Sequence, residues 1–173
     1  MPIISAKIKA SIEVRQTGAS DFGPPMFTPT ISGLVNLTDG TGAGMANIMW
    51  ADERTVASGA NDDIDLAGTL KDAFGVTVAA AEIVAILIIN APASGAANTT
   101  NLTLGAGTNP VAGWLGGTTP TLGPIRPGGV FLRAESDAAG ICAVTAGTAD
   151  ILRVANSSGA AATYQIVIIG RTA

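Results

Sequence analysis

Short runs of β-branched and other apolar residues, each ended by glycine, proline, serine, threonine or asparagine, are the feature that most constrains the fold of this chain. Residues 7–14 show the pattern most clearly, because Ile8, Ala10, Ile12 and Val14 alternate with polar residues. Alternation with a period of two is typical of a half-buried strand. Repeated short strands with such punctuation indicate an all-β sandwich or barrel with almost no helix.

The same reasoning predicts about eight to ten strands along the chain. The candidate segments, besides 7–14, are residues 31–37, 45–56, 63–66, 76–89, 101–104, 111–115, 129–134, 141–146, 150–154 and 162–169. Residues 45–56 could alternatively form a short helix, although a strand is favoured. Residues 76–89 are long enough for a helix, but their β-branched side chains favour a pleated surface, so a central strand is expected there.

Two local features are predicted beside these strands. Thr69–Phe74 is the most helical segment, and Gly75 suits the end of a helix. Residues 150–155 and 162–169 are expected to pair as a closing hairpin, because the loop between them is rich in residues that tolerate positive φ. One face of the second strand is expected to hold Tyr164, Ile166 and Ile168.

The chain divides by composition into residues 1–30 and residues 31–173. Within the first part, Gln16–Pro29 carries two glycines and three prolines, which interrupt backbone pairing. This segment is therefore expected to run as an extended N-terminal arm or surface loop after the first strand. Residues 31–173 are expected to form a single β-sandwich domain, since a chain of 17.1 kDa usually folds around one core.

The chain contains no histidine and one cysteine. Histidine is the usual general base and the commonest metal ligand at neutral pH, so its absence removes most hydrolase and transition-metal designs. Only 13% of the residues are charged and the net charge is −4, which leaves no basic footprint for nucleic acid. A surface with so little charge suggests that partners cover much of it. Cys142, among apolar neighbours, is expected to be a small buried residue.

Some acidic and glycine-rich patterns resemble binding motifs, but each is incomplete. Asn61, Asp63 and Asp65 occupy alternate positions, as the first ligands of a calcium loop do, yet Leu66 and Asp72 stand where that loop needs glycine and glutamate. The segment Gly40–Gly44 resembles a phosphate-binding loop only in its glycines, since no Lys-Ser/Thr pair follows it.

The other chemical candidates are equally general. A serine or threonine nucleophile would need a lysine base, for which the chain offers Lys7, Lys9 and Lys71. Paired carboxylates for glycoside hydrolysis could come from Glu53, Asp62, Glu82 or Glu135, but any acidic β protein offers as many. We therefore expect no enzyme activity, and no catalytic, cofactor-binding or metal-binding residues.

The sequence gives no sign of membrane insertion or export. Its longest apolar stretch, residues 76–89, is interrupted by Thr77 and Glu82 and is shorter than the roughly 18–20 residues that cross a bilayer. The N-terminus lacks the pattern of a secretory signal. Synthesis and folding in a cytoplasm are expected.

Several short segments, which follow one another in the same order, resemble a group of small tailed-bacteriophage virion proteins. Those proteins are found among head and structural genes. The resemblance covers most of the chain from Leu37 onward and is less distinct over Ser5–Ile31. The segments are residues 37–44, 52–66 with 63–68, 72–75, 125–130, 143–148, 151–156 and 164–170.

This resemblance implies a jelly-roll-like antiparallel β-sandwich that coats the capsid as a decoration or cement protein, commonly as a homotrimer. The implied partners are the major capsid protein and further copies of the chain, without nucleic acid or membrane. The implied location is the capsid surface of the virion, after synthesis in the cytoplasm of a bacterial host. The arm Gln16–Pro29 would then clamp the lattice and become ordered on binding.

Two other classes remain open. A receptor-binding or fibre-type β-sandwich module would expose aromatic residues in its tip loops, for which Trp50 and Trp114 are the candidates, although core positions are expected for both. A tail or neck structural component would assemble into rings in place of decorating a lattice.

Overall fold

The computed structural model describes residues 4–111, 113–115 and 121–172. Within these ranges the chain forms strands and no helix. The strands are β1 (Ala6–Glu13), β2 (Gln16–Thr17), β3 (Met26–Phe27), β4 (Thr30–Asp39), β5 (Met45–Ala46), β6 (Ile48–Val56), β7 (Asn61–Asp65), β8 (Glu82–Ile89), β9 (Leu102–Gly105), β10 (Thr121–Ile125), β11 (Val130–Ala134), β12 (Cys142–Ala143), β13 (Ile151–Asn156) and β14 (Ala162–Arg171). The all-β prediction is confirmed, and residues 45–56 form strands instead of a helix.

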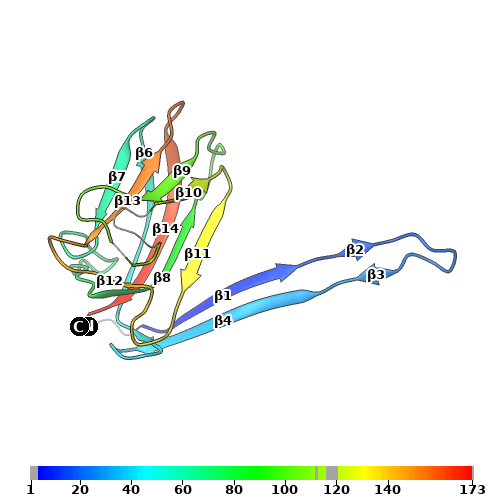
Figure 1. Ribbon diagram of the computed structural model, residues 1–173, viewed down its shortest axis with the longest axis horizontal. Coiled ribbons are helices and arrows are strands. Elements are labelled where there is room, and N and C mark those ends of the chain that lie inside the picture. Colours follow the sequence, from blue (N-terminus) through cyan, green and yellow to red (C-terminus); the bar gives the residue numbers. More distant parts are fainter. Residues whose placement is uncertain (1–3, 112, 116–120, 173) are drawn as a thin grey trace.

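Two antiparallel sheets face each other and form a β-sandwich (Figure 1). One sheet has the strand order β10-β9-β13-β7, and the other has the order β11-β8-β14-β6, with β12 paired to the start of β8. The strand β8 lies between β11 and β14, so the predicted central strand is confirmed, although it begins only at Glu82.

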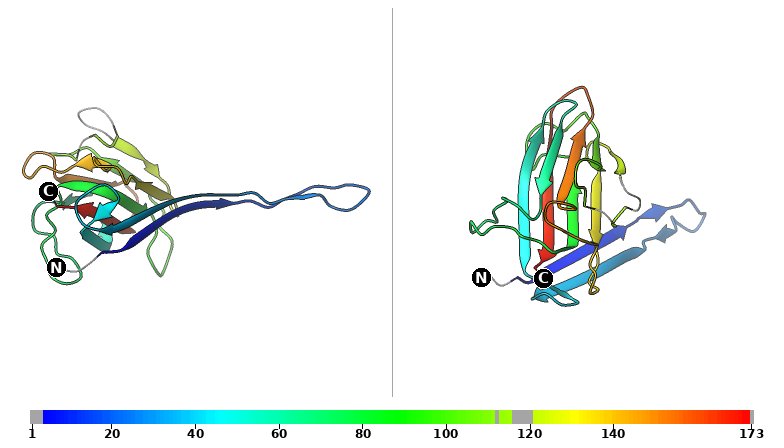
Figure 2. Two further views of the ribbon diagram at one scale, coloured as in Figure 1. Left: turned by 90° about the horizontal axis from the view of Figure 1, so that it is seen from below. Right: turned by 60° about the vertical axis from the view of Figure 1, so that its left-hand side comes forward.

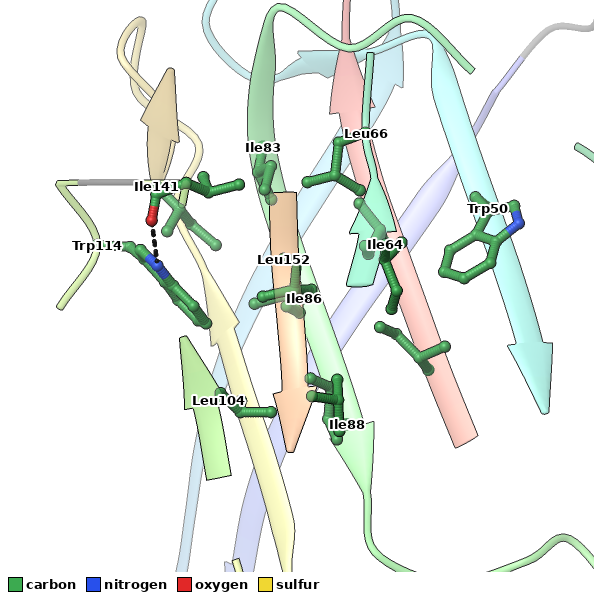
Figure 3. Packing of buried hydrophobic residues seen from close by; sticks show 14 of the residues in the cluster. Trp50, Ile64, Leu66, Ile83, Ile86, Ile88, Leu104, Trp114, Ile141 and Leu152 are labelled. Atoms are coloured by element: carbon green, nitrogen blue, oxygen red, sulfur yellow. Dashed lines mark hydrogen bonds between the residues drawn. The ribbon is translucent and has the colours of Figure 1, made fainter. Parts of the chain in front are cut away.

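The core lies between the sheets and receives alternate side chains from both of them. Figure 3 shows Ile64, Leu104 and Leu152 from one sheet packed against Ile86 and Ile88 from the other. In β14 the predicted apolar face is confirmed, because all three of its expected residues are buried. These are Tyr164, Ile166 and Ile168.

The predicted helical turn at Thr69–Phe74 is wrong, because these residues form a loop. The carboxylate of Asp72 accepts hydrogen bonds from the backbone N–H groups of Phe74 and Val76, at 2.9 and 2.8 Å. Gly75, with φ of 78°, lies in this turn and does not end a helix. A side chain that bonds the local backbone competes with helix formation, and here it wins.

The predicted hairpin at the C-terminus is also wrong. The strand β13 pairs with β7 and β9, whereas β14 pairs with β6 and β8, so the loop between them crosses from one sheet to the other. The side-chain amide of Asn156 holds this crossing, because it donates to the carbonyl groups of Val56, Ala57 and Ala160 at 2.8–3.1 Å. Both strands bury an apolar face, and facing the core from opposite layers satisfies both.

Two further differences fall between residues 111 and 125. Val111 and residues 113–115 form no strand, and residue 112 lies outside the described ranges. The edge strand β10 was not expected, because Gly123 and Pro124 lie inside it. Its register with β9 shifts between Leu122 and Ile125, which is how an edge strand accommodates a proline.

The N-terminal part of the chain forms a long two-stranded ribbon that projects from one end of the sandwich (Figures 1 and 2). The strands β1 and β4 pair antiparallel from Ala6 opposite Leu37 to Glu13 opposite Thr30. Beyond them β2 and β3 pair, so the segment Gln16–Pro29 contains a short ladder in spite of its prolines. We call residues 6–39 the arm, residues 6–14 and 29–37 its stem, and residues 16–27 its tip.

Candidate functional site: the projecting arm

The stem of the arm has two chemically different faces. Cross-strand register places Ile8 opposite Val35 and Ile12 opposite Ile31. Side chains of directly paired residues point to the same face of a sheet, and successive residues alternate. The first face therefore carries only apolar residues and one glycine, namely Ala6, Ile8, Ala10, Ile12, Val14, Pro29, Ile31, Gly33, Val35 and Leu37. The opposite face carries Lys7, Lys9, Ser11, Glu13, Thr30, Ser32, Leu34 and Asn36.

The apolar face is buried only where the arm joins the sandwich. Leu37 is fully buried in a second apolar cluster, outside the main core, together with Val84, Ala85 and Ile169 of the sheet. Ala6, Ile8 and Val35 of the stem pack against this cluster. The base of the arm thus lies across the outer surface of the sheet β11-β8-β14-β6.

Farther along the arm the same face is exposed. Ile12 is 68% exposed and Ile31 is 72% exposed, and in the tip Phe22 is fully exposed. Seven of the twelve exposed large apolar side chains in the described ranges lie on the arm. An isolated two-stranded ribbon is marginally stable in water, and contiguous apolar exposure marks a surface for contact.

A buried arginine connects the arm to the end of β14. Arg171 is 1% exposed and its guanidinium forms an ion pair with Glu82. It also donates to the backbone carbonyl of Gly42 at 2.8 Å, and to those of Asp137 and Ala138 at 2.9 and 2.7 Å. The segment Gly40–Gly44, which resembled a phosphate loop, is therefore the turn after the arm, and it supplies a carbonyl to this arginine.

A groove of about 290 Å³ opens where the stem diverges from the sheet. The aliphatic side chains of Ile8, Leu87, Leu132 and Val167 line it, beside Lys7 and Lys9 of the arm. The two lysines, considered above as possible bases, thus lie at the base of the arm.

The acidic residues considered as catalytic candidates hold the structure together. Asp62 receives two hydrogen bonds from Arg54, at 2.5 and 2.7 Å, and one from the hydroxyl of Tyr164, at 2.7 Å. Burial opposes the ionisation of Asp62, but these hydrogen bonds outweigh it and hold the pKa of its carboxyl below the usual value. Burial and the contact with Asp62 raise the pKa of Tyr164. This network links β6 and β14 of one sheet to β7 of the other.

The other carboxylates considered as a catalytic pair have separate partners. Glu82 pairs with Arg171, Glu135 pairs with Arg133, and Glu53 accepts a hydrogen bond from the backbone of Ala93 at 2.5 Å. Lys71, the remaining candidate base, donates to the hydroxyl of Thr77 at an exposed bridge.

The acidic pattern that resembled a calcium loop lies on strand β7. Arg153 donates two hydrogen bonds of 2.6 Å to Asp63 and lowers the pKa of its carboxyl. Asp65 accepts from the backbone N–H of Ala67, which turns the chain after the strand. In the described ranges, no group of three or more histidine, cysteine, aspartate or glutamate side chains is placed to hold a metal ion.

Both tryptophans belong to the main core, as expected. Trp50 is 4% exposed and Trp114 is 6% exposed, and the ring of Trp114 meets Phe131 edge-on at 5.8 Å. The indole N–H of Trp114 donates to the carbonyl of Val111 at 3.0 Å, as drawn in Figure 3. The expected burial of Cys142 is also confirmed, and burial raises the pKa of its thiol to about 12.

Comparison with known proteins adds no identity: no family model, curated protein or solved structure matches the chain. Among the described residues, no helix of sufficient length and apolarity to cross a membrane is found.

Sequence reasoning found the arm but missed how it is built. The alternation of apolar and polar residues in β1 is visible in the sequence. The part of the apolar face that β4 contributes depends on the register that places Ile31 opposite Ile12, and no local pattern predicts that register. Arg171 was not singled out at all. The one available signal was an arginine directly after a run of apolar strand residues, where burial demands a partner.

Proposed function

We propose that the protein is a structural component of a tailed-phage virion and that it decorates and stabilises the capsid. In this role it contacts the major capsid protein lattice, and three copies form the decorating unit. The exposed apolar face and tip of the arm carry the proposal, because they form a contact surface and not a reaction site.

The order of the strands supports a jelly-roll form of the sandwich. Counting β6, β7, β8, β9, β10, β11, β13 and β14 as strands one to eight, one sheet holds strands one, eight, three and six in that order. The other holds strands two, seven, four and five. This interleaving is what a double-sheet jelly roll requires, and it therefore supports that form, which occurs in viral capsid domains.

The use of charge in the sandwich also supports a structural role. The buried or half-buried charges described above, at Arg54, Asp62, Glu82 and Arg171, are held in ion pairs that fix strands and loops. A decoration protein needs a rigid body and a large area of contact, and it needs no acid, base or cofactor.

The experiment is a co-sedimentation assay with expanded capsid shells of the phage that encodes the protein. We expect the intact chain to sediment with the shells, and a variant that lacks Gln16–Pro29 to bind at least about tenfold more weakly, because apolar anchors dominate such interfaces. If the shortened variant binds as tightly as the intact chain, the segment Gln16–Pro29, with the tip of the arm, is not the lattice contact. If neither binds, the decoration role is wrong.

One observation favours a fibre-type or receptor-binding module as the second candidate. Phe22 is fully exposed near the end of a projecting ribbon, which is where an adhesion module would place an aromatic side chain. The two tryptophans no longer serve this alternative, since both are buried. Binding of the protein to host cells that is lost in Phe22→Ala, without binding to shells, would favour it.

A further inference from the structure

The outer surface of the sheet β11-β8-β14-β6 carries apolar rows that the arm covers only in part. Leu132, Leu87, Val167 and Ala51 are consecutive neighbours across the four strands. Their sequence neighbours Phe131, Ile86, Ile88, Ile166, Ile168 and Trp50 face the core. By alternation this row, which we call the middle row, therefore faces outward.

The middle row lies directly beside the row that the arm already covers. That row consists of Ala134, Ala85, Ile169 and Met49, again in register across the sheet. Ala85 and Ile169 belong to the apolar cluster under the base of the arm, and Ala134 packs against it. Val167 of the middle row also packs against this cluster, and together with Leu87 and Leu132 it lines the open groove at which the stem leaves the sheet.

The protein's own arm leaves this surface open because it runs away from the sandwich. Figures 1 and 2 show the ribbon leaving the end of the sandwich and extending well beyond it. The distal stem, with Ile12 and Ile31, therefore lies where its own sheet is absent. The same molecule thus has an exposed apolar ribbon face and, at a different place, a half-buried apolar sheet surface that borders an open groove.

We propose that the distal stem of one copy docks on the middle row of a second copy of this chain. The occupant follows from continuity: Ile8 and Val35 of the same ribbon face already pack on the neighbouring row of the same sheet. The two surfaces are thus complementary where they meet within one chain. A second copy presents the same surface to the part of the ribbon that is still exposed.

This contact joins different surfaces of the two copies, so it closes into a ring when the rotation between copies allows it. Each copy then gives one arm and receives one. The inference goes beyond capsid decoration and does not depend on it, because it concerns the free protein.

The first test compares two double variants of the same ribbon. In Ile12→Asp/Ile31→Asp a cross-strand pair of the apolar face becomes acidic, and in Ser11→Asp/Ser32→Asp the adjacent pair of the opposite face does so. Both variants place like charges opposite each other, so the charge repulsion within the ribbon is matched. Circular dichroism and the thermal midpoint of each variant show whether the sandwich remains folded.

Sedimentation velocity at micromolar concentration gives the readout. We expect oligomers for the unchanged chain and for the serine control, and at least about tenfold weaker association for the isoleucine variant. A monomeric unchanged chain would overturn the proposal. So would equal association of the two variants.

The second test identifies the surfaces in contact. Singly substituted Ile12→Cys and Leu132→Cys proteins are mixed under oxidising conditions, while the native Cys142 stays buried. A disulfide between the two different variants is the expected product. Dimers of Ile12→Cys with itself, without the mixed product, would show arms packing on arms and contradict docking on the sheet. Because no shells are present, neither outcome depends on capsid binding.

Discussion

At the scale of single residues, ion pairs and hydrogen bonds connect strands at the edges of an apolar sandwich. Arg54 and Asp62 close one edge, where β6 and β7 belong to different sheets. The hydroxyl of Tyr164, a side chain that is fully buried, reaches the same carboxylate from the core. Three groups from three strands are thus satisfied together, which a buried network requires.

Substitution of Asp62 tests this network through the pH dependence of the free energy of unfolding. The pKa of Asp62 in the folded protein lies below that of the unfolded chain, so its stabilising effect is present above about pH 4 and is lost as the pH falls through the folded value. In Asp62→Asn we expect a loss of about 1–2 kcal/mol in the free energy of unfolding at pH 7, discounted for the partial exposure of Arg54. The variant should also lose less stability in acid.

Chemical denaturation between pH 2.5 and 7 measures both effects, with Asp21→Asn on the exposed arm as the matched control. The control should follow the unchanged chain at every pH. An Asp62→Asn variant with an unaltered acid dependence would contradict the assigned role of the network.

At the scale of elements, the arm divides into a half that belongs to the core and a half that does not. Both halves use the same alternation in β1 and β4, and only their distance from the sandwich differs. Burial of a large aliphatic side chain stabilises a protein by about 1.5–3 kcal/mol, whereas an exposed one contributes little. The distal stem therefore adds almost nothing to the stability of a single copy.

Two substitutions in β4 test this division. Leu37, at the base, is 1% exposed, so Leu37→Ala should lower the free energy of unfolding by about 2–5 kcal/mol. Ile31, in the same strand, should cost no more than about 0.5 kcal/mol when replaced by alanine in the monomer. Denaturant unfolding at a concentration where the protein is monomeric gives both numbers. Similar losses at the two positions would mean that the distal stem packs against its own sandwich.

Prediction from sequence succeeded where the pattern was local. Alternation within β1 and β14, and the β-branched run of β8, depend on neighbours in the chain, so their strands could be recognised. The edge strand β10 was missed because its glycine and proline argue against a strand. The helix at Thr69–Phe74 was expected because the residue pattern does not show that the Asp72 side chain bonds the local backbone.

The pairing of strands was beyond reach for a different reason. The loop between β13 and β14 has the composition of a hairpin turn, yet the strands lie in opposite sheets. Which partner a strand takes depends on how all of the apolar faces are buried at once, and a single segment does not contain that information. The same limit concealed the continuous apolar face of the arm, which forms only when β1 meets β4.

At the scale of the whole molecule, a packed sandwich carries an arm with an exposed apolar face. That face does not stabilise a single copy, so we expect another protein to cover it. The sandwich is stabilised by one large apolar core and by the ion pairs Arg54–Asp62 and Arg171–Glu82. The arm is held at its base by a second cluster and by the turn that Arg171 fixes. The proposed capsid decoration and the proposed docking of the arm on a second copy both depend on this separation of a packed body from a projecting contact surface.

The location and copy number of the protein in purified particles test the central claim most directly. A reconstruction of the virion is the measurement. For a capsid-decorating protein we expect on the order of hundreds of copies, arranged by the symmetry of the shell on its outer surface, with the arms covered by neighbouring protein. A dozen copies or fewer at the neck or tail, or arms that extend freely into solvent, would contradict it.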